Sequence, residues 1–515
     1  MAQVENSQKQ VKLTKTLRRW DLIFFSVCAI ISVDAVAGLA SWGLGASVVW
    51  FFLFVFIFLL PYGLVTAELG AAFPAEGGIY TWVRMAYGKL AGSLTSIQYW
   101  IANPFWIGGS LAAVTIACIN TFFLRPNGHG DLGTLGSIII GLVFVWINIG
   151  IAVVALKYGK WAANIGAWVK AIAVFSFVAL VVANLAKNGL PQGIAATSTY
   201  VPSASNFLAV VGGIVFLFVG FELESGASEE MLDPQRDVPV GILRSGIITA
   251  VLYILVVGGI LLTLPVEQLG NLSGGLTDAF SYVNAAVIGD GGGATVLGYF
   301  FGIIVILTLI SSGSVWILGS ARVQAVAALD GAAPRALGKF GKAGTPTTMA
   351  WLSGIIGSIS VIGVFWVSSG GGDTLNNAMA VFLGIALSTA VLCYIFTVPA
   401  TITLRKKYPD APRPFKVPGG MVGLWICVIL AEACIILTGI TLLWPGLIDG
   451  ILGQKYDIAD PANWGVSRLF FEATTLGTWI AILLLGVIFW AIGRAETKGA
   501  DVNVEDLIVA VPEEA

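Results

Sequence analysis

Two carboxylates and one ammonium group stand out because each lies inside a long run of apolar residues. Asp34 occupies the small-residue stretch 32–38, Glu222 directly follows Gly220 and Phe221, and Lys170 lies well inside a third run. An ionisable side chain near the middle of a bilayer costs about 3 kcal/mol, and such residues mark substrate, ion or proton pathways. These residue types could therefore bind a charged solute or transfer a proton.

The apolar runs that hold these residues dominate the composition. Of the 515 residues, 57% are hydrophobic and 11% are charged, whereas charged residues make up about 25% of a typical soluble domain. This composition predicts a membrane protein and excludes a soluble enzyme or a disordered chain. With 27 basic against 29 acidic residues, nothing in the net charge attracts nucleic acid.

No residue pattern indicates catalysis, a metal site or a cofactor. Each of the five cysteines lies in an apolar run without the spacing of a metal site, and His129, the single histidine, lies in a polar loop. The sequence also shows no nucleophile–base pair and no phosphate-binding loop. We therefore expect neither an enzyme nor a bound metal or cofactor.

The fold class that the sequence predicts is an all-α membrane protein with twelve transmembrane helices. A helix needs about 20 apolar residues to cross the bilayer, and these runs are continuous rather than alternating. The N-terminal segment has no cleavable signal pattern, so the first run is expected to be retained. The expected spans are 20–45, 47–69, 90–124, 134–155, 163–186, 206–230, 240–264, 294–325, 346–367, 374–404, 421–444 and 473–493.

The distribution of Lys and Arg predicts the orientation in the cell membrane. Starting from a cytoplasmic N-terminus, most of the 27 basic residues fall on the cytoplasmic face, as positively charged loops do. We expect a multi-pass protein of the cytoplasmic membrane with both termini inside. Its tails would be 1–19 and 494–515.

The first and sixth expected spans carry polar residues at mid-depth and are expected to be interrupted. Five helices separate the two interruptions, which indicates two inverted five-helix repeats. The repeats would form a transport core at 20–404, followed by two trailing helices within 405–493. No sequence identity between the two halves is evident, so the repeat is inferred from layout.

A helix interruption creates a binding site from backbone groups. Each helix end frees four donors or four acceptors. Carbonyl groups at the end of one half-helix can hold an ammonium group, and the N-terminus of the next half-helix can hold a carboxylate. Two such interruptions favour a zwitterionic ligand.

Four motifs follow in order along the chain. They are PAEGGIYTW (74–82); FVGFE (218–222) with Glu229, Glu230 and DPQRDVP (233–239); Arg322 with Asp330, Gly331 and Pro334; and RPFKVPG (413–419). With these motifs the chain resembles the amino acid–polyamine–organocation superfamily over about residues 15–420. The resemblance implies two inverted repeats, alternating access, and an amino acid, amine or related organic cation as cargo.

The resemblance also implies roles for the three ionisable residues. Asp34 stands where relatives commonly have a glycine-rich stretch; it could pair with a substrate ammonium, carry a proton, or be satisfied by local N–H groups. Glu222 matches an acid associated with proton coupling, with a structural hydrogen bond as the alternative. Lys170 matches a lysine that replaces sodium in proton-coupled members; alternatively it reaches the membrane surface.

Two aromatic residues complete the expected binding site. Phe216 falls where relatives place a lid over the substrate, and Trp106 could form a pocket wall; for both, core packing is the alternative. The proton-coupling set is Asp34, Lys170 and Glu222. The expected substrate-binding residues are Ser32, Asp34, Ala35, Ala37, Gly38, Trp106, Phe216, Gly220, Phe221 and Glu222.

The sequence and the resemblance together predict a secondary transporter of an amino acid or related amine. It would be proton-coupled or exchanging and independent of sodium. A putrescine-type polyamine importer is the alternative, and a non-transporting membrane sensor is a third reading. A salt-bridge cluster at the inner rim is expected from Glu229, Glu230, Asp233, Arg236, Asp237 and Arg322. The oligomeric state stays open.

Overall fold

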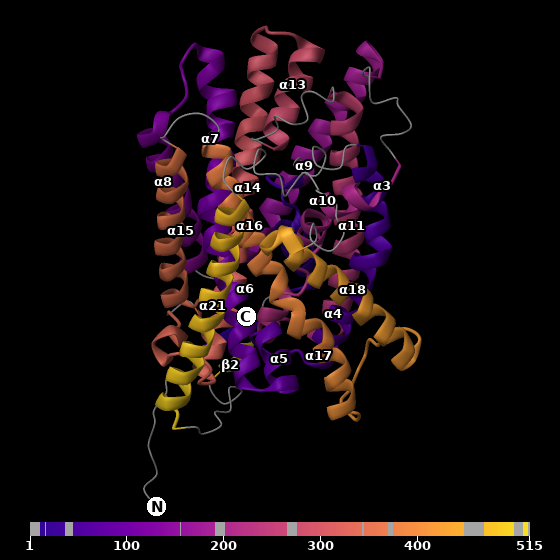
Figure 1. Cartoon of the computed structure of the whole chain (residues 1–515), viewed down its shortest axis with the longest axis vertical. Coiled ribbons are helices and arrows are strands. Elements are labelled where there is room, and N and C mark those ends of the chain that lie inside the picture. Colours follow the sequence, from indigo (N-terminus) through magenta and orange to yellow (C-terminus); the bar gives the residue numbers. More distant parts are fainter. Residues whose placement is uncertain are drawn as a thin grey trace, which may run out of the picture.

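Long helices running side by side build the protein, as the computed structural model shows (Figure 1). The structure describes residues 11–15, 17–36, 45–154, 156–190, 201–264, 275–341, 344–368, 374–447, 468–498 and 508–512. Helices satisfy their own backbone hydrogen bonds, which a bilayer cannot do for them. The apolar runs of the sequence therefore become helices.

The first half of the chain contains most of its irregular helical turns. Two of these are π-helices inside one long crossing, and the first of them begins at Ile107, shortly after Pro104. The elements are α1 (Arg19–Ile30), α3 (Gly45–Phe54), η1 (Val55–Leu59), α4 (Leu60–Ala72), α5 (Ile79–Tyr87), α6 (Lys89–Trp106), η2 (Ile107–Leu111), α7 (Ala112–Ile119), η3 (Asn120–Leu124), η4 (Arg125–Asn127), α8 (Gly133–Val154) and α9 (Leu156–Asn188).

The second half of the chain contains the longest helix among the described residues, α14, which has 38 residues. Its elements are α10 (Ala204–Leu217), η6 (Leu223–Glu230), α11 (Pro234–Thr263), α13 (Leu276–Ile288), α14 (Gly292–Leu329), η7 (Arg335–Gly338), α15 (Thr347–Ser368), α16 (Thr374–Leu392), α17 (Tyr394–Lys407), α18 (Gly420–Leu443) and α21 (Arg468–Glu496).

Ten helical stretches within the described residues are long and apolar enough to cross a membrane. They correspond to ten of the twelve expected spans. The first and sixth expected spans do not qualify, because in the described residues their helices are only 12 and 14 residues long. These are the two spans expected to be interrupted.

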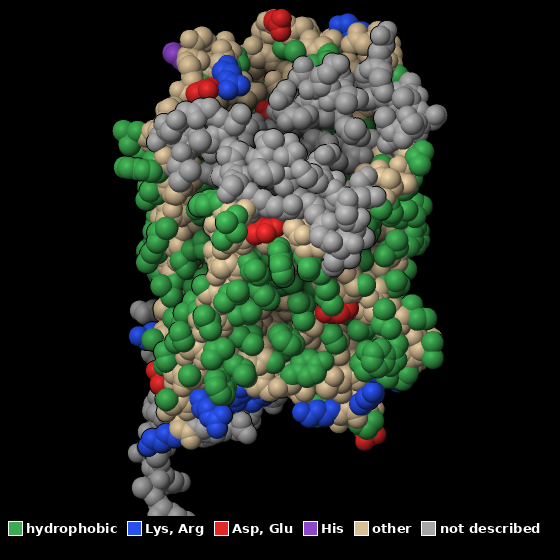
Figure 2. Space-filling view, viewed as in Figure 1, with side chains coloured by type: hydrophobic (Ala, Val, Ile, Leu, Met, Phe, Trp, Pro, Cys, Tyr) green, Lys and Arg blue, Asp and Glu red, His purple; other side chains and the backbone are tan. Residues whose placement is uncertain are grey.

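The outer surface has the polarity of a membrane protein. Figure 2 shows hydrophobic side chains in a broad band around the face in view, with Lys and Arg side chains gathered below it. We call this lower end, which includes Arg405, Lys406 and Lys407 at the end of α17, the basic end. An apolar band bounded by a basic rim matches the layout that the sequence predicted.

The tails add strands that an all-α fold does not include. β1 (Val11–Lys15) pairs in parallel with β2 (Ile508–Pro512), with Val11 opposite Ile508. The low-complexity appearance of the C-terminal tail gave no sign of a strand. Both segments are short, and apolar residues alternate with polar ones only in part. Their pairing therefore depends on the helices that bring the two tails together.

Candidate transport site

The first interruption lies at residues 31–36, directly after α1. Ile31 adopts an extended conformation and 33–35 form a turn. The last carbonyl groups of α1 are all capped by side chains from other helices. Trp316 Nε1 donates to the Ala29 oxygen at 2.9 Å, and the Tyr253 hydroxyl donates to the Ile30 oxygen at 2.5 Å.

Lys170 of α9 caps the remaining two carbonyl groups. Its Nζ donates to the oxygens of Cys28 and Ile31, the latter at 2.5 Å. The side chain is 0% exposed, so it does not reach the membrane surface. The ammonium group therefore lies at the end of α1.

A third helix closes this joint. Ser312 of α14 also donates to the Cys28 oxygen, at 3.4 Å. A Cβ added to Gly166 of α9 would lie 2.5 Å from both Cys28 Sγ and Ser311 Cβ, so only glycine allows α1, α9 and α14 to approach this closely. Lys170 of α9 and Ser312 of α14 thus meet at the Cys28 oxygen of α1.

Asp34 is held within the first interruption by three donors. Ser32 Oγ donates to its Oδ1, while Trp106 Nε1 and Ser110 Oγ donate to its Oδ2 at 2.9 and 2.7 Å. A carboxylate has about four acceptor positions, so one position stays available for a ligand. Asp34 is also partly exposed, unlike the buried carboxylates described below.

The π-helix η2 places two of these donors on the same side. Trp106 ends α6 and Ser110 lies in η2, four residues later. The extra residue in a π-turn changes the direction of the helix face, a device that is frequent at functional sites. Pro104 lacks a backbone N–H and so removes one hydrogen bond of the regular helix.

The second interruption comprises residues 218–222, between α10 and η6. Gly220 has φ = +112°, a conformation in which a side chain is strained. An added Cβ would also lie 2.7 Å from Trp316 Cζ2. Glycine is therefore required both by the backbone and by the indole ring that packs on it.

Glu222 accepts hydrogen bonds from three tyrosine hydroxyls. Tyr62 of α4 donates to Oε2, while Tyr99 of α6 and Tyr394 of α17 donate to Oε1 at 2.9 and 2.6 Å. The residue is 1% exposed. Glu222 therefore ties the second interruption to three neighbouring helices, which is the structural role that the sequence left as an alternative.

Glu224 points away from the tyrosines. Ser26 Oγ of α1 donates to its Oε2 at 2.6 Å, and Gly241 of α11 adjoins its Oε1. That Oε1 atom is buried and has no hydrogen-bond partner in the described part of the chain. Glu224 thus joins η6 to α1.

Aromatic rings connect the two interruptions. Trp106, which bonds Asp34, lies 6.4 Å from Trp316, which in turn lies 5.9 Å from Tyr99, the partner of Glu222. Phe216 packs edge-on against Trp106 at 6.2 Å. The distances join ring centroids. A continuous series of aromatic contacts therefore links the partners of Asp34 to those of Glu222, and the faces of such rings attract cations.

The remaining expected binding residues differ in their placement. Ser32 is fixed by a hydrogen bond from its backbone N–H to the Tyr253 hydroxyl at 2.8 Å, and Ala35 is partly buried. Phe221 is 0% exposed and packs on Tyr62, so its ring belongs to the core. Ala37 and Gly38 lie outside the described residues.

Ion pairs close the basic end below the site. Arg322 of α14 bonds Glu76 at 2.7 Å, and both are buried. Arg19 bonds Asp237 at 2.7 Å, whereas Arg236 and Asp233 make a 3.8 Å contact on the surface. Side chains of Glu229 and Glu230 lie outside the described set. The expected cluster forms in part, and Glu76 was missing from it.

Asp330 is the centre of a second group of contacts at this end. The Tyr80 hydroxyl donates to it at 2.5 Å, Arg84 pairs with it, and Lys89 Nζ lies 3.4 Å from its Oδ1. Burial raises the pKa of the Asp330 carboxyl, and the Tyr80, Arg84 and Lys89 contacts lower it again. These contacts join α5 and α6 to the end of α14.

Several residues of the site escaped the sequence analysis. Tyrosines and tryptophans inside apolar runs are indistinguishable from packing residues when only the sequence is read. Their partners, carboxylates or carbonyl groups, come from distant helices. The missed residues are Tyr62, Tyr99, Ser110, Tyr253, Trp316 and Tyr394.

The sequence matches a family model described as amino acid permease over residues 17–449. The chain belongs to the amino acid permease family. This confirms the resemblance that the four motifs indicated. The matched region begins before α1 and ends after α18, so it contains both interruptions and every side chain of the site.

Curated relatives of this permease include transporters of different solutes. It is 28% identical to a probable agmatine/putrescine antiporter of Lactococcus lactis, over 81% of this chain and 84% of the relative. It is 24% identical to a branched-chain amino acid permease of Bacillus subtilis, over 79% and 84%. An aspartate-proton symporter of the same organism is 23% identical over 87% and 83%.

Proposed function

We propose that this permease is a secondary transporter that binds the ammonium group of an amino acid or related amine at Asp34. The observation that supports this most directly is the set of contacts at the end of α1. Side chains, including the Lys170 ammonium, already cap the carbonyl groups there. These carbonyl groups are therefore not available to a substrate cation. Asp34, which is partly exposed and retains an acceptor position, is the group that remains for it.

The aromatic rings complete the proposed cation site. Trp106, Trp316 and Tyr99 form the path between the two interruptions, and a cation over such a ring gains about 0.5–2 kcal/mol. The substrate carboxylate, where there is one, would meet the backbone N–H groups of the interruptions. Phe216 would cover the bound substrate from its position against Trp106.

The proposed transport cycle alternates access between the two sides of the membrane. Twelve crossings in two inverted five-helix repeats plus two trailing helices, with both termini cytoplasmic, remain our proposed layout. The Arg322–Glu76 and Arg19–Asp237 pairs close the basic end here. These pairs would separate when the site opens to the cytoplasm.

We propose that coupling uses protons or exchange rather than sodium. The buried Lys170 ammonium lies where α1, α9 and α14 meet, and a fixed positive charge there opposes the binding of a metal cation. Asp34 and Glu222 are the proposed proton-responsive partners. For Glu222, release of its tyrosine donors would accompany protonation.

A polyamine such as putrescine is the alternative cargo. The agmatine/putrescine antiporter among the relatives favours it. Glu222 already accepts three hydrogen bonds, so a second ammonium group would depend on the aromatic faces. An amino acid places its second charged group on backbone N–H groups instead.

Uptake into proteoliposomes tests the proposal. Labelled putrescine, agmatine, leucine and aspartate would be supplied in turn, with and without a pH gradient and a preloaded counter-substrate. Asp34→Asn should reduce the apparent affinity for the transported solute by about tenfold or more, because a hydrogen bond to a charged group contributes roughly 1.5–3 kcal/mol. The matched control is Asp131→Asn, which alters an exposed pair with Arg125.

Two outcomes would contradict the proposal. If Asp34→Asn leaves the apparent affinity for the transported solute unchanged, this carboxylate does not bind the substrate cation. An uptake rate that does not change with the pH gradient and needs no counter-substrate would contradict the proposed coupling. Absence of uptake for every solute, together with ligand-induced thermal stabilisation, would favour the sensor reading.

A further inference from the structure

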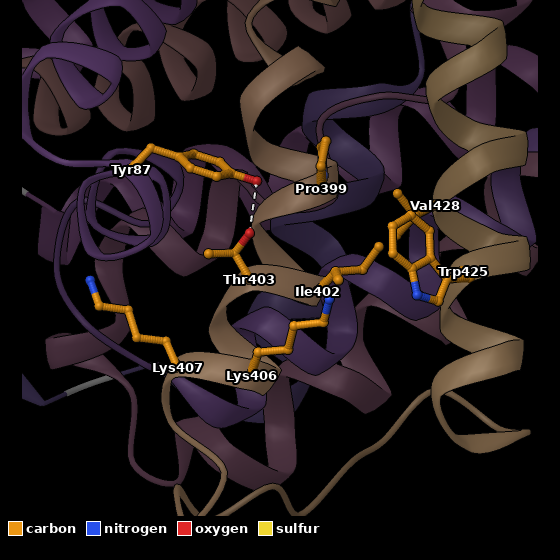
Figure 3. Close-up of a pocket in the computed structure, with 8 residues that line it drawn as sticks. All are labelled: Tyr87, Pro399, Ile402, Thr403, Lys406, Lys407, Trp425 and Val428. Carbon is orange, nitrogen blue, oxygen red and sulfur yellow. Dashed lines mark hydrogen bonds between the residues drawn. The ribbon is translucent and has the colours of Figure 1, made fainter.

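A cavity of about 500 Å³ opens at the basic end, away from the transport site. It lies between α5, α17 and α18. Figure 3 shows Pro399 and Val428 above, Lys406 and Lys407 below, and Trp425 at one side. The cavity thus has an apolar part and a basic part, arranged along the length of α17.

Within the part of the chain that the structure describes, the two lysines differ from Arg405 and Arg413 in forming no ion pair. Arg405 bonds both oxygens of Glu68, at 2.6 and 2.5 Å, and Arg413 lies 3.8 Å from the same carboxylate. Over the described residues, Lys406 and Lys407 form no ion pair. Neither positive charge is therefore neutralised by a direct ion pair with a described residue.

Each ammonium group retains donors for a ligand. Lys406 Nζ lies 5.8 Å from the centroid of the Trp425 ring, and Lys407 Nζ donates to the Met85 oxygen at 2.8 Å. An ammonium group has three N–H donors, so these contacts leave at least two on Lys407. These contacts turn the two ammonium groups to opposite sides of α17, Lys406 toward α18 and Lys407 toward α5, so that they flank the basic part of the cavity (Figure 3).

A neutral donor lies opposite the lysines. The hydroxyls of Thr403 and Tyr87 lie 3.1 Å apart, and because only one of them donates across that contact, the other keeps a proton for a ligand. Burial raises the pKa of the Tyr87 hydroxyl, and the Glu432 carboxyl adds to the rise. The phenol therefore stays protonated as a donor.

Glu432 restricts where an anion can lie. It follows Val428 by one turn on α18, and its buried Oε2 has no partner in the described chain. An anionic group would be repelled there if the carboxyl were ionised. The basic rim is therefore the place for an anion, and the apolar part is the place for a hydrocarbon chain.

The cavity borders the surface that faces the membrane. Val422, Ile426 and Ile429 of α18 are 70%, 54% and 58% exposed, as expected of side chains in contact with lipid. Trp425 lies among them, and tryptophan favours the boundary between headgroups and acyl chains. A lipid can therefore enter the cavity sideways, whereas a soluble molecule would have to enter through the basic rim.

We propose that this cavity binds one anionic phospholipid. The phosphate group lies between Lys406 and Lys407 and accepts a hydrogen bond from the Tyr87–Thr403 pair. An acyl chain covers Pro399, Ile402 and Val428. The bound lipid joins α5 and α17 to α18, the trailing helix beyond the transport core.

Native mass spectrometry of the full-length permease tests the proposal. The protein in neutral detergent would be titrated with phosphatidylglycerol, phosphatidylcholine and glycerol phosphate. We expect the first phosphatidylglycerol to bind several-fold more tightly than phosphatidylcholine. Lys406→Gln/Lys407→Gln should weaken that binding roughly tenfold, since each basic residue near an anionic headgroup contributes to its binding.

The matched control removes the same charge elsewhere at the basic end. Lys339→Gln/Lys498→Gln changes two lysines that are exposed near the ends of α14 and α21, and it should leave the binding unchanged. If both double variants lose phosphatidylglycerol binding equally, the loss reflects general surface charge, and the proposal is overturned. Retained binding in Lys406→Gln/Lys407→Gln, or equal binding of glycerol phosphate, would overturn it as well. Size-exclusion chromatography of each variant shows that it is folded.

Discussion

At the scale of single residues, the three ionisable groups at mid-depth have different environments. Asp34 is partly exposed and keeps an acceptor position, Glu222 is buried beneath three tyrosine hydroxyls, and Lys170 is buried against backbone carbonyls. A carboxylate or ammonium group inside a protein needs such partners to offset its lost hydration. This difference supports our proposal that Asp34 is the residue that binds the substrate.

The tyrosines around Glu222 yield a stability prediction. Tyr99→Phe or Tyr394→Phe removes one donor from a buried carboxylate, and each should lower the free energy of unfolding by about 1–3 kcal/mol. Thermal unfolding of the purified protein measures the change. The control is Tyr299→Phe, whose hydroxyl bonds Asn127 at an exposed site; an equal loss there would contradict the assignment.

At the scale of elements, the interruption after α1 depends on α9, α11 and α14. These three helices supply Lys170, Tyr253 and Trp316, which replace the hydrogen bonds that a continuing helix would have made. Freed carbonyl groups would otherwise be unsatisfied inside the membrane. The interruption is therefore a property of packed helices.

Lys170→Met provides a test at this scale. It keeps the length of the side chain but leaves the Cys28 and Ile31 carbonyl groups without their ammonium partner, so we expect more than tenfold slower uptake. Wild-type uptake should be unchanged when potassium replaces sodium. The control is Lys187→Met on the same helix, because the exposed Lys187 ammonium donates to the Ala286 and Val287 oxygens where water can substitute for it.

Normal uptake by Lys170→Met would show that the ammonium group is dispensable. Sodium-dependent uptake by the wild type would contradict the coupling that we propose. The two measurements are independent, because the first concerns the integrity of the interruption and the second concerns the ion that drives transport.

At the scale of the whole molecule, the distribution of basic residues supports the orientation that we propose. The basic end carries the ends of α17 and α21, with Arg405, Lys406, Lys407 and Arg494. Positively charged segments stay on the cytoplasmic side. The loop with His129 lies in the connection after η4, which the same rule places outside.

Cysteine labelling measures this orientation. In a variant without native cysteines, we expect an impermeant maleimide to label His129→Cys in intact cells and Lys498→Cys only after permeabilisation. Both positions are exposed, so accessibility within the fold is matched. Labelling of Lys498→Cys in intact cells would contradict the proposed topology.

Much of the architecture was readable from residue types alone. Composition and run length predicted membrane-crossing helices, and Asp34 with Gly220 and Glu222 predicted where two helices are interrupted. These features are local: an apolar run satisfies its own backbone, and an acid or a glycine at mid-depth weakens the helix that contains it. The four motifs likewise sufficed to indicate the family.

Only the tertiary structure decided what surrounds each charge. Lys170 caps α1, three tyrosines hold Glu222, and Trp106 with Ser110 leaves Asp34 one open position. Within the described residues, Lys406 and Lys407 form no ion pair, whereas the neighbouring Arg405 bonds Glu68. Each of these outcomes depends on side chains from helices that are far apart along the chain, and no local pattern determines which of them meet.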